Sequence, residues 1–71
     1  MKVTAAQTEK LLKGNQPFTQ LGFNMLLTRL RTQYRKDSSQ SVVQKGMNEI
    51  NQFLSKFATI MKADYETILS L

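Results

Sequence analysis

The sequence predicts an all-α protein with three helices, and three observations carry this prediction. Apolar residues recur at spacings of three and four, which is the period of an amphipathic helix. The longest series contains Val43, Met47, Ile50, Leu54, Phe57, Met61, Tyr65 and Ile68. Two polar breaks, 14–17 and 37–39, separate the periodic segments. The first break holds the only proline, a residue typical of turns.

The size of the chain limits how it can be stabilised. Its 71 residues form one domain, 1–71, that is small for a stable core. Domains of this size usually add disulfides, a metal or an oligomeric interface. The sequence has no cysteine and no histidine, so disulfides are excluded and the usual zinc ligands are missing. Oligomerisation or very efficient helix packing is the remaining expectation.

The first helix is expected over about residues 4–13. Thr4 is a suitable N-cap, and Gln7 stands three residues later, as in a capping box. Gly14 is a suitable stop. A helix of about nine residues is unstable alone in water, so its two adjacent leucines are expected to pack against other helices.

The second helix is expected over about residues 18–36. Its main apolar stripe contains Phe23, Leu26, Leu27, Leu30 and Tyr34. A second apolar set, Phe18, Leu21 and Met25, lies on nearly the opposite side at about 100° per residue. The first half is therefore apolar almost all round, and such a helix is expected to be buried on more than one side. Gly22 is expected to let a neighbouring backbone approach.

The third helix is expected over about residues 38–70, which is about 45 Å of helix. Asp37 or Ser38 is a suitable cap for it. Asp64 interrupts its apolar series, and two interpretations follow. Either the stripe drifts around a continuous helix, or the helix bends or restarts with Asp64 as a cap. We favour the continuous helix.

The apolar stripe of the third helix is longer than the first two helices can cover. In a single chain the segment near residues 60–71 is expected to stay bare, and soluble monomers rarely expose such a patch. We therefore expect a homodimer with C2 symmetry, the commonest oligomer symmetry, to complete the helical bundle. The alternative is a compact three-helix monomer with a frayed C-terminus.

The net charge of +5 is concentrated in one part of the chain. No acidic residue stands between Glu9 and Asp37, and that interval holds six cations: Lys10, Lys13, Arg29, Arg31, Arg35 and Lys36. Such an asymmetry favours an anionic partner for this basic region. The alternative is that these side chains only solvate two short helices.

The residue types that most catalysis needs are missing. Without histidine or cysteine there is no Cys-His or Ser-His machinery, and the sequence has no glycine-rich phosphate loop and no spaced carboxylate cluster. We expect no enzyme activity, cofactor, metal site or small-molecule substrate. No apolar run is long enough to span a bilayer or to act as a secretory signal. A cytoplasmic protein is expected, and an excreted product without a cleaved signal stays open.

Two functions remain. The first is a non-enzymatic protein-interaction module (an adaptor, small chaperone or inhibitor) that uses the apolar face of the C-terminal helix. Its expected contact residues are Phe53, Phe57, Ile60, Met61 and Ile68. The second is nucleic-acid binding by the basic end of the second helix through the six cations above. The first is favoured, because the arginines stand at the C-terminal end of that helix and not at its N-terminal end, as a recognition helix requires.

Overall fold

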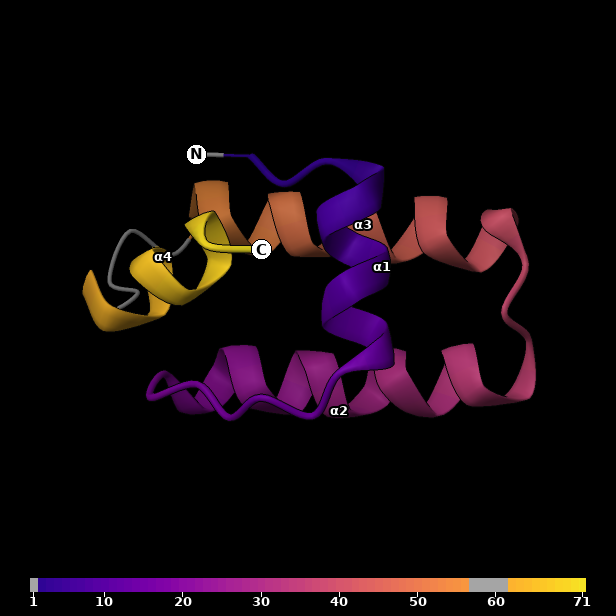
Figure 1. Ribbon diagram of the computed structural model, residues 1–71, viewed down its shortest axis with the longest axis horizontal. Coiled ribbons are helices and arrows are strands. Elements are labelled where there is room, and N and C mark those ends of the chain that lie inside the picture. The colour runs from indigo at the N-terminus through magenta and orange to yellow at the C-terminus, as the bar shows by residue number, and fades with distance from the viewer. Residues whose placement is uncertain (1, 57–61) are drawn as a thin grey trace.

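The computed structural model describes residues 2–56 and 62–71, and this part of the chain is all-helical. It contains four helices: α1 (Ala5–Lys13), α2 (Leu21–Lys36), α3 (Gln40–Lys56) and α4 (Lys62–Leu69). α2 and α3 lie antiparallel, α1 crosses both of them, and α4 lies at the end of the molecule where α2 begins (Figure 1). The long axis of the molecule is 30 Å.

The first helix has the predicted bounds, and its capping box is present. The Thr4 hydroxyl accepts a hydrogen bond from the Gln7 backbone N–H at 3.1 Å, and the Gln7 side chain accepts from the Thr4 N–H at 3.0 Å. At the other end the Gly14 N–H donates to the Lys10 carbonyl oxygen at 3.0 Å. Both ends are therefore set by residues close in sequence, which is why the sequence predicted them.

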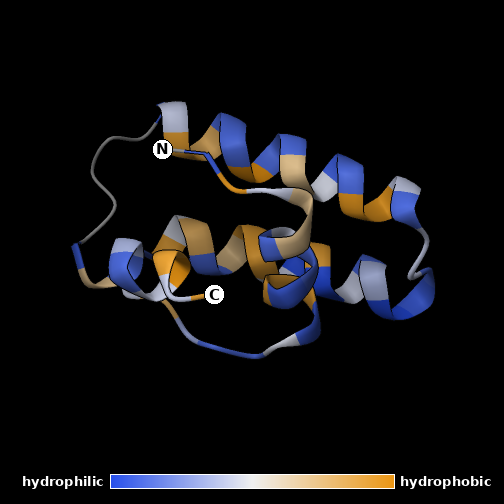
Figure 2. Ribbon diagram, turned by 45° about the horizontal axis from the view of Figure 1, so that its top comes forward, coloured by the Kyte–Doolittle hydropathy of each residue, from blue (hydrophilic) through white to orange (hydrophobic). Residues whose placement is uncertain are grey.

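The core lies where α1 crosses α2 and α3, and Figure 2 shows the hydrophobic positions of α3 on the side that faces these helices. Gly46 is buried where α1 crosses α3, and a Cβ atom there would meet α1 side chains at ordinary van der Waals distance. A Cβ atom on Gly46 would lie 3.5 Å from Leu12 Cδ1 and 3.6 Å from Thr8 Cγ2. The buried Thr8 hydroxyl donates to the Thr4 carbonyl oxygen at 2.9 Å, so no polar group is left unpaired there.

Two asparagines on helices hold the non-helical segments that precede α1 and α2. The Val3 N–H donates to Asn51 Oδ1 at 2.7 Å, and Asn51 Nδ2 donates to the Val3 carbonyl oxygen at 3.2 Å. In the same way, the Phe18 N–H donates to Asn24 Oδ1, and Asn24 Nδ2 donates to the Phe18 carbonyl oxygen. Each asparagine satisfies the backbone of a residue whose side chain is buried in the core. The predicted start of the second helix at residue 18 is wrong for this reason, and α2 begins at Leu21.

The prediction of one continuous helix over 38–70 is wrong. A helix of that length would measure about 45 Å, which exceeds the 30 Å long axis. The structure instead has α3 and α4 as separate helices. α3 also begins slightly later than predicted, at Gln40, where the Ser39 hydroxyl accepts a hydrogen bond from the Val42 N–H at 3.4 Å.

Asp64 explains the position of α4. Its side chain is only 3% exposed. Its carboxylate accepts three hydrogen bonds at the start of α2, from the Thr19 N–H at 2.8 Å, the Thr19 hydroxyl at 2.9 Å and the Gln20 N–H at 3.0 Å. A carboxylate is favoured at the positive N-terminal end of a helix. The residue that interrupts the apolar series in the sequence is thus a tertiary cap for α2, and not a cap for its own helix.

Candidate interaction surface

The apolar contact residues predicted on the C-terminal helix do not form an exposed surface where the structure describes them. Ile68 is fully buried, and Phe53 is half-buried. The Phe53 ring packs on Phe23 with ring centroids 5.5 Å apart, and it occupies the space beside Gly22 where we expected a backbone. The other three predicted contacts, Phe57, Ile60 and Met61, lie outside the described residues.

The expectation that the segment near residues 60–71 stays bare in one chain is therefore wrong at Ile68, whereas Leu69 is 66% exposed, as expected. The physical reason is the direction of α4. Asp64 is anchored to the start of α2, and Ile68 stands one helical turn later on the same side of α4, so it is buried in the core of its own chain. This burial removes part of the reason for expecting a homodimer, which stays a prediction.

Arg31, one of the six predicted nucleic-acid contacts, is used inside the fold. Its Nε donates to the Leu11 carbonyl oxygen at 2.9 Å, and its Nη2 donates to the Gln16 carbonyl oxygen at 3.3 Å. Partial burial lowers the pKa of Arg31 from its usual value. The guanidinium thereby satisfies a carbonyl in the last turn of α1, where helices leave acceptors unpaired.

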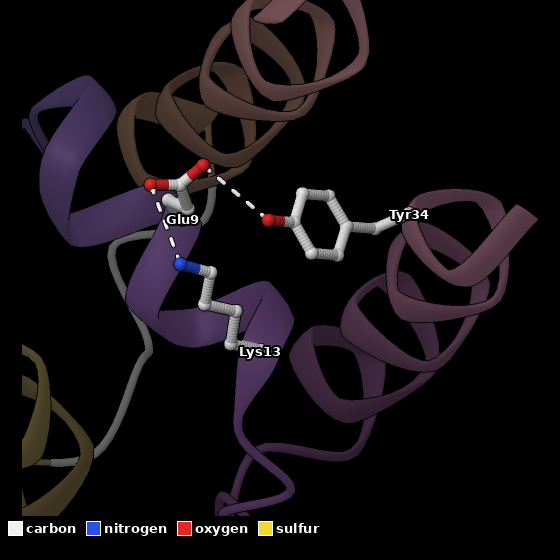
Figure 3. Close-up of polar contacts among 3 residues, drawn as sticks. All are labelled: Glu9, Lys13 and Tyr34. Atoms are coloured by element: carbon white, nitrogen blue, oxygen red, sulfur yellow. Dashed lines mark hydrogen bonds and ion pairs between the residues drawn. The ribbon is translucent and has the colours of Figure 1, made fainter. Parts of the chain in front are cut away.

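Three more of the six cations pair with different groups of the fold. Arg29 Nη2 lies 2.7 Å from a Glu49 carboxylate oxygen, and Lys10 Nζ donates to the Leu71 carbonyl oxygen at 3.2 Å. Lys13 Nζ lies 3.7 Å from Glu9, whose other carboxylate oxygen accepts a hydrogen bond from the Tyr34 hydroxyl at 3.3 Å (Figure 3). The six cations are not gathered into one patch.

A depression where α1 and α2 end brings two of these cations together. Lys13 and Arg35 both line it, with Tyr34 and Ser38 between the helix ends. Two helix C-termini point their negative dipole ends toward this region, which opposes the binding of an anion. Glu9 already shares its carboxylate with Lys13 and Tyr34. The depression is therefore a poor anion site.

Among the described residues three large apolar side chains are exposed: Leu21 and Met25 on α2, and Leu69 at the end of α4, which is 66% exposed. Leu21 is 72% exposed and Met25 is 65% exposed, one helical turn apart. The predicted burial of the second apolar set is wrong at Leu21 and Met25, whereas Phe18, its third member, is buried. α1 and α3 both cover the Phe23 side of α2, and Phe18 sits in the segment before the helix. None of the described residues buries the Leu21 side.

Five residues on this exposed side follow the spacing of a coiled-coil seam. The intervals are four, three, four and three, and we call the set the outer stripe: Leu21, Met25, Thr28, Thr32 and Arg35. The sequence contained this signal, but we assigned its first two members to a second buried face. Only the arrangement of α1 and α3 shows that the stripe is on the surface.

The middle of the outer stripe presents methyl groups. The Thr28 hydroxyl donates to the Asn24 carbonyl oxygen at 2.8 Å, and the Thr32 hydroxyl donates to the Thr28 carbonyl oxygen at 2.9 Å. Each hydroxyl thus donates within its own helix, and the Thr32 oxygen also accepts a hydrogen bond from Arg35 Nη2 at 3.3 Å. Thr28 therefore offers a neighbour mainly its methyl group, and the Arg35 guanidinium lies beside Thr32. The stripe therefore changes from apolar at the start of α2 to basic at its end, where Arg35 and Lys36 are exposed.

Other kinds of site are not visible in the structure. Among residues 2–56 and 62–71, no three carboxylate, histidine or cysteine side chains are grouped as they would be around a metal ion. No helix in this part of the chain is long and apolar enough to cross a membrane. No protein-family model, curated protein or solved structure matches the chain.

Proposed function

We propose that this chain is a small non-enzymatic protein-interaction module that binds its partner through the outer stripe of α2. The observation that carries the proposal is the exposure of Leu21 and Met25 on one side of one helix. Burying a side chain of this kind contributes about 1.5–3 kcal/mol relative to leaving it in water. A single exposed apolar side chain is ordinary, but a leucine and a methionine together on a seam of heptad spacing are what a helix-binding protein would use.

The same function class was expected from the sequence, on a different surface. We place the contact on α2 because Leu21 and Met25 are exposed together on one side of one helix, whereas on α4 Ile68 is buried and Leu69 is exposed alone among the described large apolar side chains. Nucleic-acid binding receives no specific support, because Arg31, Arg29, Lys13 and Lys10 each already pair with a group of the fold.

Site-specific photo-cross-linking tests the proposal. A photoreactive amino acid is placed at Met25 of the full chain in the cell that makes it, and a control variant carries it at Gln44, an exposed polar position on α3. We expect a discrete adduct of defined mass from the Met25 variant and none from the control. Absence of an adduct from the Met25 variant, or the same adducts from both, would contradict the proposal.

Light scattering of the purified chain shows whether an adduct contains a second copy. A monomer mass at tens of micromolar, together with an adduct whose mass excess differs from one chain, supports a different protein as partner. An adduct of two chains together with a dimer mass would instead mean that the outer stripe is a homodimer interface.

A further inference from the structure

We propose that the partner is an acidic amphipathic helix, which packs lengthwise and antiparallel on the outer stripe of α2. The inference rests on the proposed function and adds the chemistry and orientation of the partner. It depends on three properties of the outer stripe: its periodicity, the small residues in its middle, and its charge.

The periodicity of the stripe fits another helix. Residues spaced by four and three line up along one side of a helix, so their contacts follow a nearly straight seam. α2 has 16 residues, and at 1.5 Å per residue it offers a seam of about 24 Å. An extended strand or a globular surface would not contact every member of such a seam. A second helix that crosses α2 at about 20° would contact all of them.

The small residues in the middle allow a close approach. Thr28 and Thr32 stand between the larger Met25 and Arg35 along the seam. Their hydroxyls donate to α2 carbonyl oxygens, so an apolar residue of the partner can cover Thr28 without leaving its hydroxyl unpaired. At Thr32 the partner also meets Arg35, whose Nη2 donates to the Thr32 oxygen at 3.3 Å. The partner therefore needs an apolar seam over most of its length.

The charge of α2 determines which end of the partner is acidic. α2 contains no acidic residue, and Arg35 and Lys36 are exposed in its last turn. Asp37, the nearest acid in the sequence, accepts a hydrogen bond from the Ser39 N–H at 3.1 Å and so belongs to the turn before α3. Carboxylates on the partner would be favoured opposite Arg35 and Lys36.

The orientation follows from where carboxylates are stable in the partner itself. Acidic residues are favoured in the first turn of a helix, where the dipole is positive. If the acidic first turn of the partner lies at the basic C-terminal end of α2, the two helices run antiparallel. The later, apolar turns of the partner then cover Met25 and Leu21.

Other occupants fit the outer stripe less well. A second copy of α2, laid antiparallel along the whole stripe, would place Arg35 of each copy opposite Leu21 of the other. Both α2 helices would also bring cations and no acid. A nucleic-acid backbone would match Arg35 and Lys36 but would offer no apolar surface to Leu21 and Met25.

Three labelled peptides test the proposal by fluorescence anisotropy with the full chain. Each is a 16-residue helix, held by a hydrocarbon staple, with a leucine seam. The first has glutamates in its first two turns, the second has the same glutamates in its last two turns, and the third has lysines in place of the glutamates of the first. We expect the first peptide to bind most tightly. The second should bind about threefold more weakly, because exposed ion pairs contribute little free energy. The third should not bind.

Variants of the full chain assign the contact to the outer stripe. The pair Leu21→Gln and Met25→Gln should weaken binding of the first peptide by about tenfold or more, as for apolar anchors of an interface. The pair Arg35→Gln and Lys36→Gln should weaken it by about threefold and reduce its salt dependence. The matched control, Lys45→Gln with Lys62→Gln, removes the same charge from exposed positions elsewhere and should leave binding unchanged.

Three results would overturn the inference. Equal binding of the glutamate and lysine peptides would remove the role of charge. Failure of all three peptides to bind, with a cross-linked protein at Met25, would leave the proposed function standing and contradict the acidic helix. Retardation of random duplex DNA that is lost in the Arg35→Gln, Lys36→Gln variant and kept in the Leu21→Gln, Met25→Gln variant would assign the surface to nucleic acid.

Discussion

The two sides of α2 carry apolar residues at the same spacing and have opposite environments. Phe23 and Leu27 are fully buried under α1 and α3, whereas Leu21 and Met25 are among the most exposed large side chains of the described chain. The difference does not come from hydrophobicity or helical propensity. It comes from which neighbouring elements reach each side. A helix that is apolar all round is thus divided by tertiary contacts into a core face and an outer stripe.

The largest expected effect comes from the core face. Phe23→Ala removes a ring that packs edge-on against Phe18, with centroids 5.0 Å apart, and also contacts Phe53. We expect it to destabilise the fold by about 3–5 kcal/mol, which is a large part of the stability of a small domain. Urea denaturation followed by circular dichroism measures it. Met25→Ala is the comparison from the outer stripe, and it should change the free energy of unfolding by less than about 0.5 kcal/mol. Equal losses in the two variants would break the distinction between the faces.

The next effect tests how α4 contributes to the start of α2. Asp64→Ala leaves the Thr19 and Gln20 N–H groups without their acceptor, and we expect a loss of about 2–3 kcal/mol. Glu66→Ala changes an exposed carboxylate in the same helix and should cost less than about 0.5 kcal/mol. Thermal unfolding of both variants at the same pH makes the comparison. If Asp64→Ala is no worse than Glu66→Ala, the carboxylate does not hold α2 in place.

A smaller effect separates two arginines of α2. Arg31→Gln loses the hydrogen bonds to the Leu11 and Gln16 carbonyl oxygens, and we expect it to cost about 1–2 kcal/mol. Arg35 is exposed on the outer stripe, and Arg35→Gln should leave stability within about 0.5 kcal/mol. Chemical denaturation measures the free energy of unfolding of the Arg31→Gln and Arg35→Gln variants. The reverse order would mean that Arg35 is the structural residue and that the basic end of the stripe is not available to a partner.

The smallest effect on stability is expected where the effect on binding is largest. Leu21→Gln with Met25→Gln replaces exposed side chains, so the free energy of unfolding should change by less than about 0.5 kcal/mol. Helicity and the unfolding midpoint are the measurements. A marked destabilisation would show that these side chains are covered in the free protein.

The parts of the fold that the sequence predicted are those set by neighbours in the chain. The bounds of α1 follow from Thr4, Gln7 and Gly14, which are all within one turn of a helix end. The core stripe of α2 follows from its own spacing. In these regions local capping and periodicity agree with the tertiary structure.

The parts that the sequence did not predict depend on contacts between distant segments. Asp64 was noticed as an interruption, but its partners are about 45 positions earlier in the chain. The extended segment at Phe18 is held by Asn24, whose position in a helix gave no sign of that role. Spacing alone predicts a second buried face where the outer stripe lies. It shows which residues share a side of the helix, but it does not show which elements cover that side.

Solvent accessibility of side-chain methyl groups tests the central claim most directly. Methyl NMR of the full chain with a soluble paramagnetic agent compares the outer stripe with the core, before and after addition of the stapled peptide with glutamates in its first turns. We predict strong broadening of Leu21 and Met25 and none of Leu27 in the free chain, and protection of Leu21 and Met25 in the complex. Protection of Leu21 and Met25 in the free chain, or their continued broadening in the complex, would contradict the assignment of this stripe as the contact surface.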